Sequence, residues 1–131
     1  MPRSAIIGMS SRLSQFTGEK YLNIETYRRS GQAVRTPVWF VESDGLLYVR
    51  TAEETGKFKR IQNNPSVQIA PCESRGKVKG DWVKAEARQA SADTAQKMYR
   101  LFEQKYGFMN RMSRLFLRNR HYVVLEIHLA E

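Results

Sequence analysis

Apolar and polar side chains alternate along several short stretches of this chain. In the first of them Leu22, Ile24 and Thr26 alternate with polar residues, which is the period of a strand with one buried face. Glycine, proline, asparagine and aspartate separate the stretches, as expected of turns. The pattern predicts six strands, over residues 20–29, 34–41, 46–50, 66–71, 82–89 and 122–129.

Two segments between the strands carry helical signals. Thr55 can cap a short helix that Pro65 stops, and Ser91 or Asp93 can cap a second helix that Gly107 ends. Six short strands with few helices, and one long excursion before the last strand, predict a mainly β protein. The pattern favours a small antiparallel barrel over a layered α/β fold.

A proline lies inside the predicted strand 34–41. Pro37 has no backbone N–H, so one edge of this strand lacks a donor and is not expected to pair normally there. We expect such a kink to face a ligand or a subunit boundary.

The size and composition predict one globular domain over residues 1–131, with residues 1–18 as a loosely ordered N-terminal extension. Apolar residues make up 41% of the chain and charged residues 27%. No stretch reaches the roughly 20 apolar residues that span a bilayer, and the first residues are too polar for a signal peptide. The single cysteine, Cys72, is either a reactive thiol or a buried side chain, and the apolar run before it favours burial. We expect a cytoplasmic protein.

The charge predicts an anionic partner. The 22 lysine and arginine residues outnumber the 13 acidic ones, for a net charge of +9. A nucleic acid, an acidic membrane or a phosphorylated or carboxylate-rich small molecule would each suit this excess.

The junction between the third strand and the first helix has the components of a phosphate site. Arg50 and Thr51 end the strand, Gly56 lets the backbone approach a ligand closely, and Lys57 adds an ammonium group at the helix start. Free amides and the helix dipole favour an anion there. A solvated basic turn without a ligand would have the same residues.

Several segments together resemble a known family. They resemble the split-barrel, flavin-binding family of pyridoxamine 5'-phosphate oxidase-like proteins, and above all its branch of deazaflavin-dependent oxidoreductases. The likeness covers residues 20–131, and its most specific part is the stretch 56–65. The segments that carry it are residues 26–31, 35–40, 48–65, 77–83 and 85–88.

The resemblance implies a six-stranded antiparallel split β-barrel that forms a homodimer with cofactor clefts at the subunit interface. It also implies coenzyme F420, a deazaflavin, as the cofactor, with FMN as the alternative, and hydride transfer to or from a small conjugated or heterocyclic substrate. The phosphodiester and glutamate tail of F420 would account for a basic groove, which Arg28, Lys59 and Arg60 could line.

The resemblance also implies roles for individual residues. The phosphate-binding lysine of the family falls on Lys57 and its strand-end hydroxyl on Thr51, while no catalytic residue is assigned. Arg35 is shifted from the usual arginine of its strand, and Gly56 stands where a further arginine would be, which points away from the vitamin-producing oxidases. The expected cofactor-binding residues are Thr36, Pro37, Val38, Arg50, Thr51, Ala52, Gly56, Lys57 and Arg60.

Other chemistry has less support in the sequence. His121 and His128 have no cysteine or carboxylate cluster at metal-ligand spacing, so no metal site is expected. Trp39 and Trp82 either stack on the cofactor or pack within the core or an interface. Three alternatives stay open: an FMN enzyme of the same fold, a cofactor carrier without turnover, and a basic barrel that binds nucleic acid.

Overall fold

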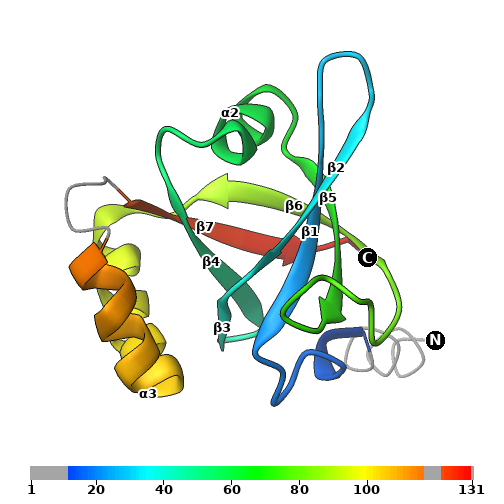
Figure 1. Ribbon diagram of the computed structural model, residues 1–131. Coiled ribbons are helices and arrows are strands. Elements are labelled where there is room, and N and C mark those ends of the chain that lie inside the picture. Colours follow the sequence, from blue (N-terminus) through cyan, green and yellow to red (C-terminus); the bar gives the residue numbers. More distant parts are fainter. Residues whose placement is uncertain (1–11, 117–121, 131) are drawn as a thin grey trace.

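The computed structural model describes residues 12–116 and 122–130, with the backbone alone for residues 108–116 (Figure 1). Strands predominate, as the alternating pattern predicts. The elements are β1 (Tyr21–Tyr27), β2 (Ala33–Val38), β3 (Phe40–Ser43), β4 (Leu46–Ala52), α2 (Gly56–Asn63), β5 (Ser66–Cys72), β6 (Val83–Gln89), α3 (Ala92–Phe116) and β7 (Tyr122–Leu129).

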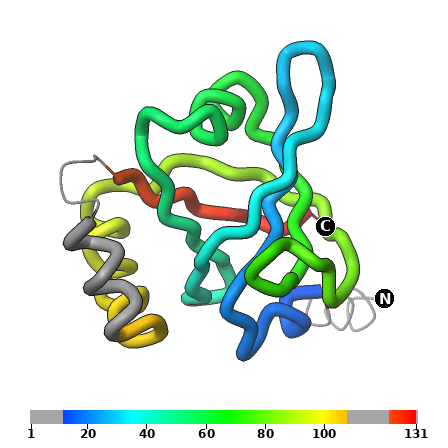
Figure 2. The backbone as a smooth tube through the Cα atoms, in the orientation of Figure 1, coloured from blue at the N-terminus to red at the C-terminus, as the bar shows by residue number. Residues whose placement is uncertain are grey.

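The strands form one antiparallel sheet that curls into a barrel. Their order is β2-β1-β5-β6-β7-β4-β3, and every neighbouring pair is antiparallel. Strands β2 and β3 lie at opposite edges of this order although only Trp39 separates them in the chain. The two edges must therefore meet, and the ribbon and the tube show the sheet curled in this way (Figure 1 and Figure 2). The expected mainly β, antiparallel barrel is confirmed.

The sheet has seven strands rather than the six that the sequence predicts. The predicted strand 34–41 is divided at Trp39 into β2, which pairs with β1, and β3, which pairs with β4. Pro37 itself lies opposite Asn23 within the β1–β2 ladder. The division follows from the change of partner strand, which the alternation of side chains does not reveal.

The inward faces of the strands and helix α2 enclose the main core. Leu22 and Ile24 of β1 and Val49 of β4 are fully buried there, together with Phe58 and Ile61 of α2. Burial of these side chains supplies most of the stability of a barrel of this size.

The N-terminal residues that the structure describes belong to the same core. Phe16 is 1% exposed and its ring meets that of Phe40 edge-on, while Leu13 packs beside them. Gln15 exchanges two hydrogen bonds with the backbone of Asp81. Phe16, Leu13 and Gln15 thus attach the described part of the expected N-terminal extension to the barrel, and residues 1–11 of that extension lie outside the described residues.

Helix α3 covers the outside of the barrel beside β4 and β7 (Figure 1). Ser91 caps it by accepting a hydrogen bond from the backbone N–H of Thr94 at 3.2 Å. Gly107 interrupts it with φ 51°, a left-handed conformation that favours glycine. Gly107 therefore ends the first helical segment of α3 as predicted, and a second segment continues beyond the kink to Phe116.

Candidate functional site

The turn between β4 and α2 is held by threonine hydroxyl groups. Thr55 caps α2 by accepting from the N–H of Phe58, and its own hydroxyl donates to the carbonyl oxygen of Ala52 at 2.9 Å. Its hydroxyl oxygen also lies 3.2 Å from that of Thr51. Because the Thr55 proton is already used, Thr51 is the donor in this contact. The 4% exposed Thr51 hydroxyl therefore supports the turn in the absence of a ligand.

The guanidinium group of Arg60 lies at the start of the same helix. Its Nε donates to the hydroxyl of Thr26 at 2.7 Å, which links α2 to β1. A Cβ atom at Gly56 would lie 2.8 Å from Nη1 of Arg60. Glycine at position 56 thus provides the space that the guanidinium occupies.

Three cations influence one another at this end of the barrel. Burial lowers the pKa of Lys57 to about 8, and the charge of Arg60 contributes to this shift. Burial also lowers the pKa of Arg60, and Arg28 adds to that effect. Within the described residues, Arg28, Lys57 and Arg60 form no ion pair with a carboxylate. We call these three residues the cationic cluster; its charge and its place beside a helix start suit an anion.

Arg50 is directed away from the cationic cluster. Its guanidinium carbon lies 5.5 Å from the ring centre of Phe102 and 5.2 Å from that of Tyr122. Side chains alternate along a strand, so Arg50 belongs to the face of β4 that α3 covers, while Thr51 is on the other face. The structure therefore brings Gly56, Lys57 and Arg60 together but leaves Arg50 apart.

The expected ring-contact residues lie further along the neighbouring strand. Thr26 pairs with Val34 in the β1–β2 ladder, and Thr36, Pro37 and Val38 follow. At about 3.3 Å per residue these three residues begin about 7 Å beyond Val34. Val38 is buried in the core and Thr36 is half-buried. A strand thus runs from the cationic cluster towards the residues expected beside the cofactor ring.

A polar network on the outer face of β1 was not foreseen from the sequence. Glu25 is 6% exposed and accepts hydrogen bonds of 2.7 Å from the hydroxyl of Tyr27 and from Nε of Arg35. Burial raises the pKa of Glu25, but these bonds outweigh it and hold the pKa below its usual value. Alternation marks Glu25 as surface-facing, and nothing local reveals that Arg35 and Tyr27 enclose it.

Both tryptophan residues make ring contacts within the chain. Trp39 stacks on Tyr106 with ring centres 4.3 Å apart and an interplanar angle of 5°. Trp82 lies under the guanidinium of Arg35, 4.7 Å from its ring centre. These contacts match the packing alternative for each side chain.

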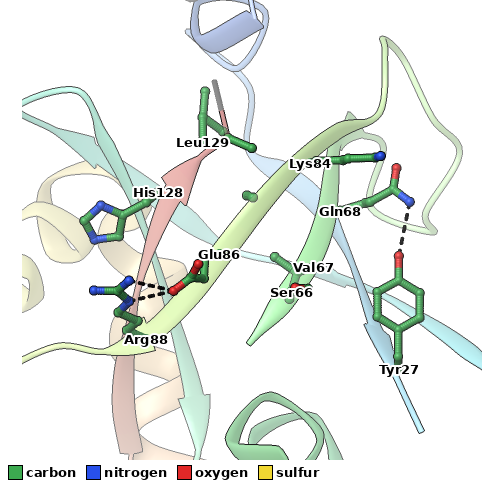
Figure 3. Close-up of a pocket in the computed structure, with 11 residues that line it drawn as sticks. Tyr27, Ser66, Val67, Gln68, Lys84, Glu86, Arg88, His128 and Leu129 are labelled. Carbon is green, nitrogen blue, oxygen red and sulfur yellow. Dashed lines mark hydrogen bonds and ion pairs between the residues drawn. The ribbon is translucent and has the colours of Figure 1, made fainter. Parts of the chain in front are cut away.

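A hollow of about 530 Å³ lies on the outer side of β5, β6 and β7 (Figure 3). As far as the described residues define its wall, none of the nine expected cofactor-binding residues lines it. It is therefore separate from the cationic cluster. Its polar side chains are those of Tyr27, Ser66, Gln68, Lys84, Glu86, Arg88 and His128.

In the part of the chain that the structure describes, no group of three or more His, Cys, Asp or Glu side chains is placed to hold a metal ion. His121 lies outside the described residues, and His128 pairs with Glu126 at 2.7 Å. None of the helices in that part is both long and apolar enough to cross a membrane.

Comparison with known proteins finds similarity in structure alone. No family model matches the chain, and no curated protein matches its sequence. A candidate pyridoxamine 5'-phosphate oxidase from Listeria innocua has a TM-score of 0.63 and 11% identity, over 100% of this chain and 95% of that one. A candidate 5-nitroimidazole antibiotic resistance protein from Bacteroides thetaiotaomicron has a TM-score of 0.67 and 14% identity, over 92% and 80% of the two chains.

An F420 reductase is also similar, with a TM-score of 0.60 and 13% identity over 90% of this chain and 92% of that one. All three identities are too low to transfer an activity, but the likeness extends over most of each chain. The fold of this protein is the split barrel of these structures.

Proposed function

We propose that this protein is an oxidoreductase that binds a phosphorylated flavin-type cofactor, coenzyme F420 in the first place. The observation that carries the proposal is the cationic cluster beside the start of α2, in which Lys57 and Arg28 both repel Arg60. The similarity in fold to a candidate pyridoxamine 5'-phosphate oxidase and to an F420 reductase supports it.

The residues present fit the phosphate of such a cofactor. Lys57 lies where burial makes its charge costly, and a phosphate would offset that cost. Arg60 offers guanidinium hydrogens beside it, and Gly56, which has no Cβ, leaves room for that guanidinium at the helix start. In this proposal the phosphate lies against α2, and the ring extends along Thr36 and Pro37 of β2.

The chemistry itself would come from the cofactor, which transfers a hydride to or from a small conjugated or heterocyclic substrate. The chain binds and orients it: the cationic cluster fixes the charged end, and β2 provides a rigid edge for the ring. Seclusion of the ring from water requires a further wall. We propose that a second copy of the chain supplies this wall, with the two cofactor clefts at the interface of a cytoplasmic homodimer.

The outer face of the sheet has features that suit such an interface. The hollow there is bounded by both basic and acidic side chains, and Glu86 already pairs with Arg88 at 2.6 Å. Sedimentation equilibrium at micromolar concentration should give twice the mass of the chain, and a monomer would overturn the dimer.

The proposal is tested by fluorescence titration of the cofactor-free protein with F420 and FMN, in parallel at moderate salt. Tight binding of F420 alone supports the deazaflavin enzyme, and a screen for hydride acceptors then follows. Tight binding of FMN alone moves the protein to the FMN enzymes of the same fold. If neither binds while an oligonucleotide binds with a steep salt dependence, the cationic cluster serves nucleic acid and the proposal is wrong.

A further inference from the structure

Thr26 contacts the cationic cluster although it lies outside the expected cofactor-binding set. Its side chain is on the inner face of β1, and the residue is 1% exposed. Its hydroxyl oxygen accepts the 2.7 Å hydrogen bond from Nε of Arg60, 34 residues further along the chain. The same hydroxyl donates to the carbonyl oxygen of Val34 on β2 at 3.5 Å. The hydroxyl is thus fixed between two strands and the helix.

This contact limits where the guanidinium group can lie. The group is planar and carries five N–H donors in a fixed arrangement. With Nε engaged by Thr26, the four hydrogens on its two terminal nitrogens remain for other acceptors. Nη1 occupies the space above Gly56, so these donors lie at the start of α2.

A tether is needed because the neighbouring charges oppose this position. Lys57 and Arg28 are both close enough to Arg60 to repel it, and the described residues offer no carboxylate that would attract it. A long side chain in such surroundings would otherwise extend into water. The buried hydroxyl of Thr26 supplies a compensating acceptor on a rigid strand.

We infer that Thr26 is a positioning residue, which together with the lack of a side chain at Gly56 holds the guanidinium of Arg60 where it meets the phosphate of the cofactor. This inference rests on the proposed function. The positioning role accounts for the buried hydroxyl of Thr26 in an apolar core. It also accounts for Gly56 at the first position of α2, where alanine would otherwise be the better helix former. Ordering the donors before the cofactor arrives reduces the entropy lost on binding.

The test compares phosphorylated and unphosphorylated probes in single variants at Thr26, Gly56 and Arg60 and in one double variant. Each protein is titrated with FMN and riboflavin, and with F420 and the deazaflavin alcohol that lacks its phosphodiester. The readout is the affinity for the phosphorylated probe divided by the affinity for its unphosphorylated partner. A general loss of fold lowers both affinities and leaves this ratio unchanged. Thr26→Val removes the acceptor at nearly constant shape, whereas Thr26→Ser retains it.

We expect Thr26→Val to lower this ratio roughly tenfold, the effect of one lost hydrogen bond to a charged group. Thr26→Ser should stay within about twofold of the unmodified protein. Gly56→Ala should lower the ratio as Thr26→Val does, because its Cβ displaces Nη1. Added to Arg60→Gln, Thr26→Val should cause no further loss, since it acts through Arg60.

Gly56→Ala also keeps the test decisive if Thr26→Val fails to fold. Its Cβ would meet only the flexible end of Arg60, and the melting temperature should not fall. If the unmodified protein binds neither phosphorylated probe, the proposed function is wrong. If it binds one of them and neither Gly56→Ala nor Thr26→Val changes the ratio, the cofactor assignment stands and the role of Thr26 is overturned.

Discussion

The hydroxyl group of Tyr106 accepts a hydrogen bond from the backbone N–H of Phe40 at 2.9 Å, which bonds helix α3 to the first residue of strand β3. The same hydroxyl donates to the carbonyl oxygen of Lys20 at 2.7 Å. Lys105 donates to the carbonyl oxygen of Phe40, and Trp39 stacks on the Tyr106 ring. Helix α3 therefore holds the point at which the chain passes from one edge of the sheet to the other.

Tyr106→Phe should destabilise the protein by about 1–3 kcal/mol, since it leaves the buried N–H of Phe40 and the partly buried carbonyl oxygen of Lys20 without their partner. Urea unfolding measures the change. Tyr99→Phe on the same helix is the matched control, because no hydrogen bond of the Tyr99 hydroxyl is found among the described residues. Equal losses in the two variants would contradict this role of Tyr106.

Lys57→Met should weaken binding of the phosphorylated cofactor by roughly 10- to 100-fold, because it removes a charged hydrogen-bond donor. It should also raise the free energy of unfolding by about 1–3 kcal/mol, since the partly buried ammonium is costly to the cofactor-free protein. Titration and urea unfolding give the two values. Lys97→Met removes the same charge from an exposed position on α3, and a similar loss of affinity there would point to a non-specific charge effect.

Affinity for the phosphorylated cofactor should fall as the pH rises above about 8, the pKa of Lys57 in the empty protein. A bound phosphate favours the ammonium form and raises this pKa, so binding takes up a proton in that range. Titrations with FMN between pH 7 and 9 should approach a tenfold loss per pH unit at the upper end. The Lys57→Met variant should show a flat profile; a profile as steep as that of the unmodified protein would assign the proton to another group.

Glu25 should contribute to the loss of stability in acid. Its pKa is lower in the folded protein than the usual 4.5. The unfolded chain therefore takes up the proton first, and the stabilising effect, complete above the unfolded pKa, is lost as the pH falls through the folded pKa. Glu25→Gln should cost about 1 kcal/mol at pH 7 and make stability less dependent on pH below 4.5. Glu73→Gln, at an exposed position, is the control, and an unchanged acid profile in Glu25→Gln would exclude this contribution.

Local signals in the sequence account for most of the elements. Thr55 caps α2 as predicted, Pro65 follows its end, and Gly107 interrupts the long helix. These features depend on a few neighbouring residues, and the conformational preferences of those residue types are enough to predict them. The strand boundaries likewise follow the alternation, with the exception of the break at Trp39.

The parts that were missed depend on residues far apart in the chain. The hydrogen bond between Thr26 and Arg60 spans 34 positions, and no spacing rule connects a strand threonine with a helix arginine. Arg50 adjoins Thr51 in the sequence, yet strand alternation sends its side chain towards Phe102. A motif that is contiguous in the sequence is thus divided between two faces of a sheet.

The position of β2 and β3 at opposite edges also constrains how quickly the molecule can fold. Each edge strand forms a local hairpin with its neighbour, but closure of the sheet requires pairs such as Leu47 with Ile127 and Ile24 with Ile69. The chain loses conformational entropy when it brings such distant residues together, before their contacts stabilise the fold. Barrels with many pairs of this kind therefore fold in milliseconds to seconds. Until β7 has docked, β4 is paired with β3 alone and β6 with β5 alone, so a chain still being synthesised exposes one unpaired edge on each of these strands.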